Sequence, residues 1–272
     1  MKNHDTHRSK NGFTIVELLV SMGITIVIIS MIVTITSIAL GAWRDSRNEV
    51  RASRQAKALL DVMAKDLESM VIRSGNNYEW FSAEADEQSG GNLDSATMAE
   101  VVFFTAATDR YNGNIGDATD DKGGDVSTVG YRMEIKDPVS GSSGDFNTFA
   151  MYRQLVNPDE TFQNLLAQTD LTGAFGGIDT GGENFICENI YELSIVFLME
   201  YTDSSNVVQQ VRVPVISNGG VTDFSIKGSG IETSPAKAEL ANARLVSADL
   251  SITVISDHGL GLLRAAGSRS EE

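Results

Sequence analysis

One acidic side chain, Glu17, stands at the start of a long apolar segment and has the clearest chemical consequence in this sequence. From Leu18 to Trp43 the chain has 26 residues without a charge. A charged side chain deep in a bilayer costs about 2.5–3.5 kcal/mol on insertion scales, so it is rarely kept without a partner. Two interpretations stay open: Glu17 reaches water at the membrane interface, or it pairs with a cation inside an assembly.

The other groups that could do chemistry are isolated in the sequence. His258 follows Asp257, but adjacent residues at the end of a strand point in different directions, so we interpret this pair as a surface turn. Cys187, the only cysteine, lies in an apolar run typical of a buried small hydrophobe, and a single cysteine excludes an intrachain disulfide. The glycine-rich segment 173–182 lacks the Lys-Ser/Thr of a phosphate-binding loop.

An acidic, glycine-rich loop is a weak candidate for calcium binding. Ca²⁺ is bound by several loop carboxylates and carbonyls, and this loop offers Asp117, Asp120, Asp121 and Asp125. Its spacing is not that of an EF-hand, and acidic loops are normally only solvated. We therefore expect no cofactor, and the chain reads as a structural protein and not as an enzyme.

Charge divides the 272 residues into distinct segments. Hydrophobic residues make up 42%, enough for a sizeable core. The net charge of -16 argues against a nucleic-acid partner, whose phosphates need a basic face. Residues 1–12 carry a net charge of +2, residues 13–43 carry -1, residues 44–73 carry +2 and the remainder carries -19. The chain therefore begins with a basic leader (residues 1–12) and an apolar segment (13–43), and it ends in a strongly acidic body (74–272).

The apolar segment 13–43 is long enough to cross a bilayer, which takes about 20 residues. It is too long for the apolar region of a cleaved secretory signal, although Ser37-Ile38-Ala39 could pass as a cleavage site. A plain signal anchor fits the length but does not predict Glu17. The basic leader favours a cytoplasmic N-terminus, although five more basic residues follow the segment: Arg44, Arg47, Arg51, Arg54 and Lys57.

Residues 44–74 have a sequence typical of a helix, because they contain neither proline nor glycine. Apolar residues recur there at steps of three and four, which predicts one face packed on the body: Ala56, Leu59, Leu60, Met63, Leu67, Met70 and Val71. Residues 13–73 as one helix would be about 90 Å long.

Residues 75–272 predict an antiparallel sheet, so the fold class is α+β. The expected strands are Glu100–Ala106, Val126–Lys136, Thr148–Val156, Phe185–Thr202, Val207–Ile216 and Leu245–Ser256. A short helix should run from Asn157 as N-cap, through Pro158 at its first position and Glu160 as the reciprocal partner, to about Gln168. Long loops are expected at Asp86–Ser95 and Tyr111–Asp125.

The segment Lys10-Asn11-Gly12-Phe13-Thr14-Ile15-Val16-Glu17-Leu18 resembles the class III signal of type IV pilins and type II secretion pseudopilins. That motif is a short basic leader ending in Gly, then Phe, and a Glu as the fifth residue of the mature chain. The resemblance implies that a prepilin peptidase removes residues 1–12 after Gly12 and N-methylates Phe13. It also implies that Glu17 neutralises the N-terminal ammonium of a neighbouring subunit, and that a long helix packs on the body as in the lollipop-shaped pilins.

The order of segments in the body resembles that of J-type minor pseudopilins, for example Val129-Gly130-Tyr131-Arg132-Met133 before Tyr152-Arg153. This implies a single-pass protein of the bacterial inner membrane with its body in the periplasm. Its partners would be other pilin-like subunits, the prepilin peptidase, the inner-membrane assembly platform and membrane lipid. A minor type IV pilin, or a signal-anchored periplasmic binding or enzymatic domain, are the alternatives.

Overall fold

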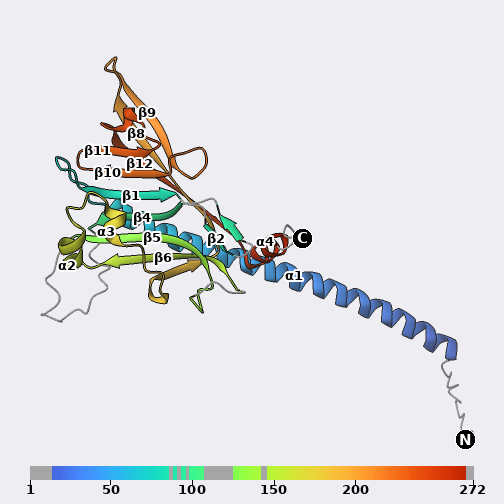
Figure 1. The fold of residues 1–272 in the computed structure, drawn as a ribbon. Helices are drawn as coiled ribbons and strands as arrows, with labels where there is room; N and C mark the ends of the chain where they lie inside the picture. The colour runs from blue at the N-terminus through green and yellow to red at the C-terminus, as the bar shows by residue number, and fades with distance from the viewer. Residues whose placement is uncertain are drawn as a thin grey trace, which may run out of the picture. The chain divides into compact units, whose positions relative to one another are not determined.

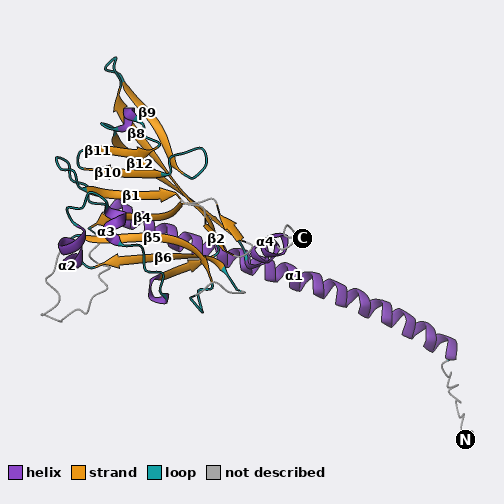
Figure 2. Ribbon diagram, in the orientation of Figure 1, coloured by secondary structure: helices purple, strands orange, loops and turns teal. Residues whose placement is uncertain are grey.

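The computed structural model describes residues 14–85, 88–90, 93–95, 98–106, 125–141 and 146–267. The chain divides into two compact units, Met1–Asn48 and Glu49–Glu272. The helices of Figures 1 and 2 are α1 (Ile15–Glu68), α2 (Pro158–Glu160), the π-helix η2 (Thr161–Leu165), α3 (Leu171–Phe175), the 3-10 helices η3 (Gly182–Asn184) and η4 (Ala238–Leu240), and α4 (Asp257–Gly267).

The second unit is built on antiparallel strands. The strands are β1 (Glu79–Ala85), β2 (Gln88–Gly90), β3 (Leu93–Ser95), β4 (Met98–Thr105), β5 (Ser127–Lys136), β6 (Thr148–Val156), β7 (Phe185–Glu188), β8 (Ile190–Thr202), β9 (Val208–Val215), β10 (Asp223–Lys227), β11 (Gly230–Ser234) and β12 (Arg244–Val254). They form a seven-stranded sheet β11-β10-β1-β4-β5-β6-β7, a three-stranded sheet β12-β8-β9 and the hairpin β2-β3. With the helix α1 this confirms an α+β fold.

Both faces of the seven-stranded sheet are buried, because alternate side chains of its central strands enter different clusters. On β4, Val101 and Phe103 join the main core, whereas Val102 and Phe104 join a second cluster with Trp80. The main core also contains the inner side chains of the three-stranded sheet, where Phe197 stacks on Phe224 with ring centroids 4.1 Å apart. The two sheets therefore share one hydrophobic core.

Different helices cover the two faces of the seven-stranded sheet (Figure 1). The C-terminal part of α1 lies against the main core, where Leu59 and Met63 are 0% and 1% exposed. On the other face, η2 and α3 place Leu165 and Leu171 on the cluster around Trp80. The predicted apolar stripe of residues 56–71 thus contributes to the core, as Leu59 and Met63 show.

Helix α1 ends at Glu68 and does not continue to residue 74. Its end has neither glycine nor proline. The chain turns into the sheet instead, because Val71 N donates to Phe104 O at 2.9 Å and Met70 forms a bridge with Thr105. The end of the helix is fixed by pairing with β4 and not by a local stop signal.

The predicted helix after Asn157 has the expected start but not the expected capping hydrogen bond. Pro158 is its first residue and Asn157 occupies the N-cap position, as predicted, but the side chain of Asn157 makes no capping hydrogen bond. The helix passes into η2 and ends at Leu165, before Gln168. Thr161, buried in η2, accepts a hydrogen bond from Thr128 N on β5 at 3.0 Å, and this contact anchors the turn.

The run 185–202, predicted as one strand, is two strands in different sheets. Asn189 separates β7 from β8 with a φ of 65°, a conformation that asparagine tolerates better than most residues. Its side-chain oxygen accepts from Thr148 Oγ1 at 2.6 Å and its amide donates to Asp257 at 2.8 Å. These bonds hold the chain where it crosses from the large sheet to the small one.

Several elements were not predicted. Strand β1 carries no alternating pattern, and β10 and β11 are only five residues each, although β10 does alternate between polar and apolar residues. The predicted loop 86–95 contains the hairpin β2-β3. His258 is exposed, as predicted, but it lies in the first turn of helix α4, so the prediction of a turn between elements was wrong. Leu260 of α4 is 7% exposed and joins the main core, and this packing stabilises the helix although it contains glycine.

Candidate functional site

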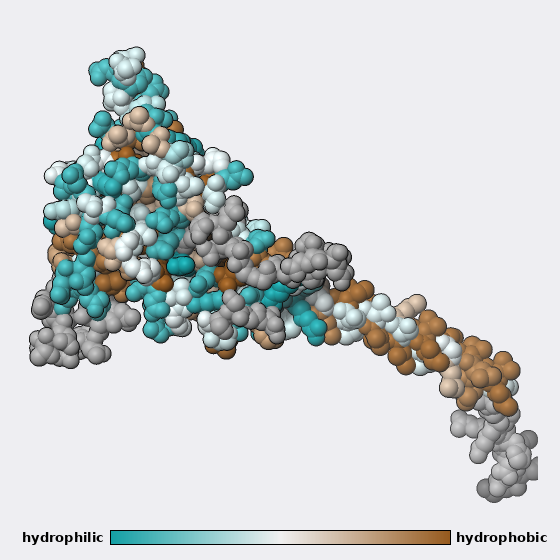
Figure 3. All heavy atoms as spheres, viewed as in Figure 1, coloured by the Kyte–Doolittle hydropathy of each residue, from teal (hydrophilic) through white to brown (hydrophobic). Residues whose placement is uncertain are grey.

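The first unit presents an apolar helix surface that the described chain leaves uncovered. From Ile15 to Leu40, the exposed fraction of the large apolar side chains lies between 49% and 81%. Figure 3 shows this surface as mostly brown, with paler residues between the brown ones, along the N-terminal part of α1. By length and hydropathy this is a helix that could cross a membrane.

Four of the hydroxyl groups within this surface are satisfied by the helix itself. Four side chains donate to carbonyl oxygens one turn back at 2.7–2.9 Å: Ser21 to Leu18, Thr25 to Ser21, Thr34 to Ser30 and Thr36 to Ile32. An unsatisfied polar group in hydrocarbon costs roughly several kcal/mol, because no water is present to form a hydrogen bond with it. The arrangement therefore suits an apolar environment.

Glu17 and Thr14 form a reciprocal cap at the start of α1. Both the backbone N–H and the Oγ1 of Thr14 donate to Glu17 Oε2 at 2.9 Å. The backbone N–H of Glu17 donates back to Thr14 Oγ1 at 3.3 Å. This is the capping box of a helix N-terminus. Thr14 is not among the predicted site residues, although the Thr-x-x-Glu spacing is a known signal for this motif.

The cap leaves part of the Glu17 carboxylate available. Oε2 receives both hydrogen bonds from Thr14, whereas Oε1 receives none from the described residues. The cap also limits the rotation of the side chain, so the open oxygen is held at the start of the helix. Glu17 can therefore serve the helix and still accept an external cation.

A second carboxylate of α1, Asp66, is fully buried in the second unit. Arg153 on β6 donates from Nε to Asp66 Oδ2 at 2.8 Å, and the hydroxyl of Tyr131 on β5 donates to the same oxygen. Thr105 Oγ1 on β4 donates to the Asp66 backbone oxygen at 3.0 Å. Three adjacent strands thus hold the last turns of α1 through one residue.

The electrostatics of this cluster favour the charged pair. Burial raises the pKa of Tyr131, and the neighbouring Asp66 carboxylate adds to the rise, so the phenol remains a donor. Burial alone would lower the pKa of Arg153, but its hydrogen bond to Asp66 leaves the pKa raised. Arg153 Nη2 is buried without a hydrogen-bond partner among the described residues. Removing Asp66 would leave the Arg153 cation, whose side chain is only 14% exposed, unpaired.

The sequence alone does not predict this cluster. Asp66 lies three residues after Met63 and seven after Leu59, so it occupies the buried face of the predicted stripe. An acid at a core position of an amphipathic helix is a signal of a buried partner. The partner itself, Arg153, could not be identified because it lies 87 residues away.

Most other predicted site residues lie outside the described part of the chain or are not brought together. Gly12 and Phe13, the predicted processing site, are outside it, as are the calcium candidates Asp117, Asp120 and Asp121. Asp125 is described and exposed. Within the described ranges, no group of three or more His, Cys, Asp or Glu side chains could hold a metal ion.

Two further residues have clear places. Cys187 on β7 is 3% exposed, and burial with the nearby Glu188 carboxylate raises its pKa to about 12. Its thiol is therefore a poor nucleophile. His258 is exposed in the first turn of α4.

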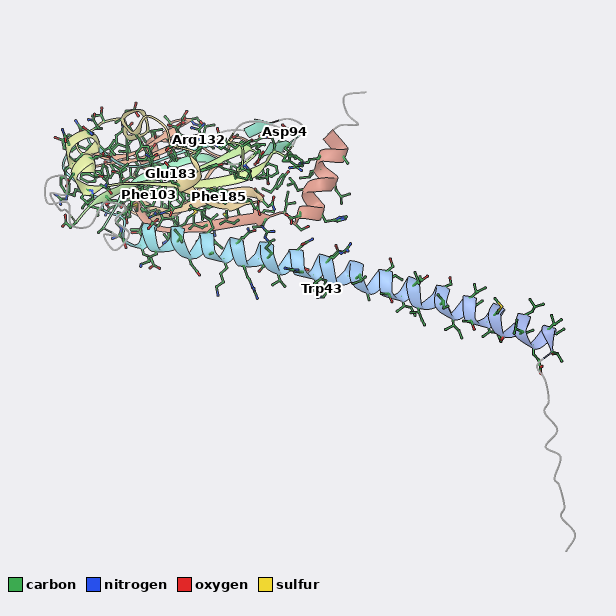
Figure 4. All side chains as sticks on the ribbon, turned by 90° about the horizontal axis from the view of Figure 1, so that it is seen from below. Trp43, Asp94, Phe103, Arg132, Glu183 and Phe185 are labelled. Carbon is green, nitrogen blue, oxygen red and sulfur yellow. The ribbon has the colours of Figure 1, made fainter. Side chains whose placement is uncertain are left out.

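The glycine-rich segment 173–182 covers the outer face of the large sheet. Ile178 packs on Tyr152 and Ala150, and the backbone oxygen of Thr180 accepts from Lys136 Nζ at 2.6 Å. Glu183 and Phe185, which follow this segment, are labelled in Figure 4. The same figure labels Trp43 on α1.

Comparison of the chain with models of known protein families gave no match. Searches against curated proteins and against solved structures also gave none.

Proposed function

We propose that this chain is a minor pseudopilin of a type II secretion system, a structural subunit at or near the tip of a periplasmic pseudopilus. One observation carries the proposal: the apolar half of α1 starts with a capped carboxylate at Glu17 and is otherwise uncovered. The motif Gly12-Phe13 directly before it adds the processing signal of this class.

The uncovered surface supports an assembly role through simple energetics. Soluble monomers rarely expose contiguous apolar patches above a few hundred Å², roughly. The exposed apolar side chains of residues 15–40 are not isolated, because every large apolar side chain in this segment is about half exposed or more. Lipid would cover this surface before assembly, and helices of neighbouring subunits would cover it afterwards.

Glu17 would supply specificity in that assembly. Its open oxygen can accept the ammonium of a processed, N-methylated Phe13 from the next subunit. Two opposite charges in apolar surroundings offset their desolvation only when they meet with good geometry. The capping contact with Thr14 pre-positions the carboxylate for that meeting.

The proposal places the chain in the bacterial inner membrane, crossing it once, with the N-terminus in the cytoplasm and the second unit in the periplasm. Prepilin peptidase, the assembly platform and other pseudopilins would be its partners. A signal-anchored binding or enzymatic domain is the alternative of a different class, and it requires neither processing at Gly12 nor a role for Glu17.

Mass spectrometry of the protein extracted from membranes tests the proposal. We expect a mature chain that begins at N-methylated Phe13, and an unprocessed chain from cells that lack the prepilin peptidase. A mature N-terminus near Gly41, or a chain that keeps residues 1–12 in cells with an active peptidase, would contradict it. Neighbouring genes for a secretin and an assembly ATPase, without a retraction ATPase, would favour secretion over a type IV pilus.

A further inference from the structure

Positive charge follows the apolar surface of α1 directly, and the proposed function does not use it. Trp43 ends the uncharged segment and is 60% exposed, and Arg44 and Arg47 beside it are exposed as well. At about 100° per residue in a helix, Asp45 and Glu49 both lie roughly 160° around the axis from Arg47. The cations and the acids of this segment therefore occupy different sides of the helix.

Neither arginine has an acidic partner among the described residues. The guanidinium of Arg47 lies over the Trp43 ring, 5.6 Å from its centroid, and is thereby held next to the end of the apolar segment. Arg51, one turn farther along, differs: it pairs with Glu188 at 2.6 Å and lies 3.9 Å from Asp257. The charges of Arg44 and Arg47 remain available to an external anion.

We propose that Trp43, Arg44 and Arg47, which we call the basic collar, bind the headgroups of anionic phospholipids in the leaflet where α1 leaves the membrane. The proposal rests on the membrane span of the proposed function. A guanidinium matches a phosphate with two parallel hydrogen bonds, and tryptophan favours the interface between hydrocarbon and water. The collar then fixes the depth of α1 in the bilayer.

Position favours lipid over an acidic protein as the occupant. Arg44 and Arg47 are within about 6 Å of Trp43 along the helix, so their side chains reach the headgroup layer. Arg54 is about 16 Å beyond Trp43 along α1, and charges in 0.15 M salt are screened over about 8 Å. The collar therefore excludes Arg54, which supplies a matched control with the same side chain on the same helix.

Fluorescence quenching by brominated lipids tests the collar in the full-length protein, reconstituted in vesicles of phosphatidylcholine and phosphatidylglycerol. The bromine is placed on the chains of either lipid, at equal mole fraction. Trp80, only 3% exposed in the body, gives a background that the Trp43→Phe variant measures and removes. Quenching of Trp43 then reports which lipid lies next to the collar.

We expect brominated phosphatidylglycerol to quench Trp43 more than brominated phosphatidylcholine, with about a fivefold local enrichment for each arginine that contacts the anionic surface. The excess should decrease as salt is raised. The double variant Arg44→Gln/Arg47→Gln should quench equally with both lipids, and Arg54→Gln should behave as wild type.

Equal quenching of wild-type Trp43 by both lipids would overturn the collar while leaving the membrane span intact. An excess that persists in the double variant would assign the preference to other residues and overturn it too. If wild type shows no excess but the double variant loses crosslinks to partner subunits, the cations serve a protein. If neither lipid quenches Trp43, the span itself fails, and the proposed function with it.

Discussion

Each half of α1 carries an acidic side chain, and the two side chains differ in burial and in their hydrogen-bond partners. In the first unit, Glu17 lies on an uncovered apolar surface, and one of its oxygens receives no hydrogen bond from the described residues. In the second unit, Asp66 is buried and is held by Arg153 and Tyr131. One carboxylate has its partner within the chain, and we infer that the other obtains its partner from another subunit.

The apolar residues of the two halves differ in the same sense. Before Trp43 they surround the helix on all sides, whereas Leu59 and Met63 lie on one face that the sheets cover. A helix that is apolar on all sides is typically buried in a large core or in lipid. The comparison indicates that the second half stabilises the body and that the first half does not.

Truncation should separate the halves with the largest effect. A chain starting at Trp43 keeps Leu59, Met63 and Asp66 and should be soluble and folded, because its acidic surface resists association. A chain starting at Asn76 lacks all three and leaves Arg153 buried without its acid, so it should not fold. Circular dichroism and gel filtration measure both. Aggregation of the longer chain together with folding of the shorter one would show that the stripe lies outside the core.

Removing the buried acid should be the most damaging single substitution. Asp66→Asn leaves the Arg153 cation unpaired, and breaking a buried pair costs about 3–5 kcal/mol of unfolding free energy. The double variant Asp66→Asn/Arg153→Met should recover a large part of that loss. Urea unfolding of the chain starting at Trp43 measures both variants. A loss below about 1 kcal/mol for Asp66→Asn, the range of exposed ion pairs, would show that the pair is not buried as described.

Replacing a leucine by alanine should change the unfolding free energy of the body differently in the two halves of α1. Leu59→Ala should lower the unfolding free energy of the body by about 2–5 kcal/mol, the usual range for a buried leucine. Leu19→Ala, at a position 63% exposed, should leave the body unchanged in the detergent-solubilised full chain. Equal losses for the two substitutions would remove the distinction between the halves.

The smallest expected effect concerns pH. Burial raises the pKa of Glu84 on β1 above 4.5, and the carboxylates of Asp223 and Asp170 add to the rise. A carboxyl with a raised folded pKa contributes its stability below the unfolded pKa and loses it as pH rises through the folded pKa. Glu84→Gln should therefore be more stable than wild type at pH 7, and the difference should shrink toward pH 4.

Unfolding curves at several pH values measure this difference, with the exposed Glu239→Gln as a control for the change in net charge. A Glu84→Gln advantage that is constant with pH would mean that the titration of Glu84 is not its cause.

The sequence predicted most parts of the fold that have a local pattern, the short strand β10 being an exception. The alternation of Leu193, Ile195 and Phe197 identified β8, and the steps of three and four identified the buried face of α1. Strand β1 was missed because its first five residues are buried whichever face they point to, so no alternation exists to read. Helix α4 was missed because Gly259 and Gly261 lower its propensity, and packing of Leu260 on the core overrides this.

For the candidate site, the sequence identified Glu17 but missed how it is held. The Thr14–Glu17 spacing was readable as a capping box, whereas the contact of Asp66 with Arg153 depends on the pairing of β5 with β6 and could not be read locally. The break at Asn189 has the same cause, since its bonds to Thr148 and Asp257 join three distant segments.

The most direct test of the central claim is crosslinking of Glu17→Leu to partner pseudopilins, with a secretion assay, in cells that lack the native copy. Thr14→Ala removes the hydroxyl that makes the cap reciprocal but keeps the carboxylate and the backbone N–H that donates to it, so it tests the contribution of the cap apart from the assembly contact. We predict that Glu17→Leu inserts and is processed but loses crosslinks and secretion, that Glu17→Gln is intermediate, and that Thr14→Ala retains most of both. Wild-type crosslinking and secretion from Glu17→Leu would contradict the account, because Glu17 would then merely face water at the membrane interface.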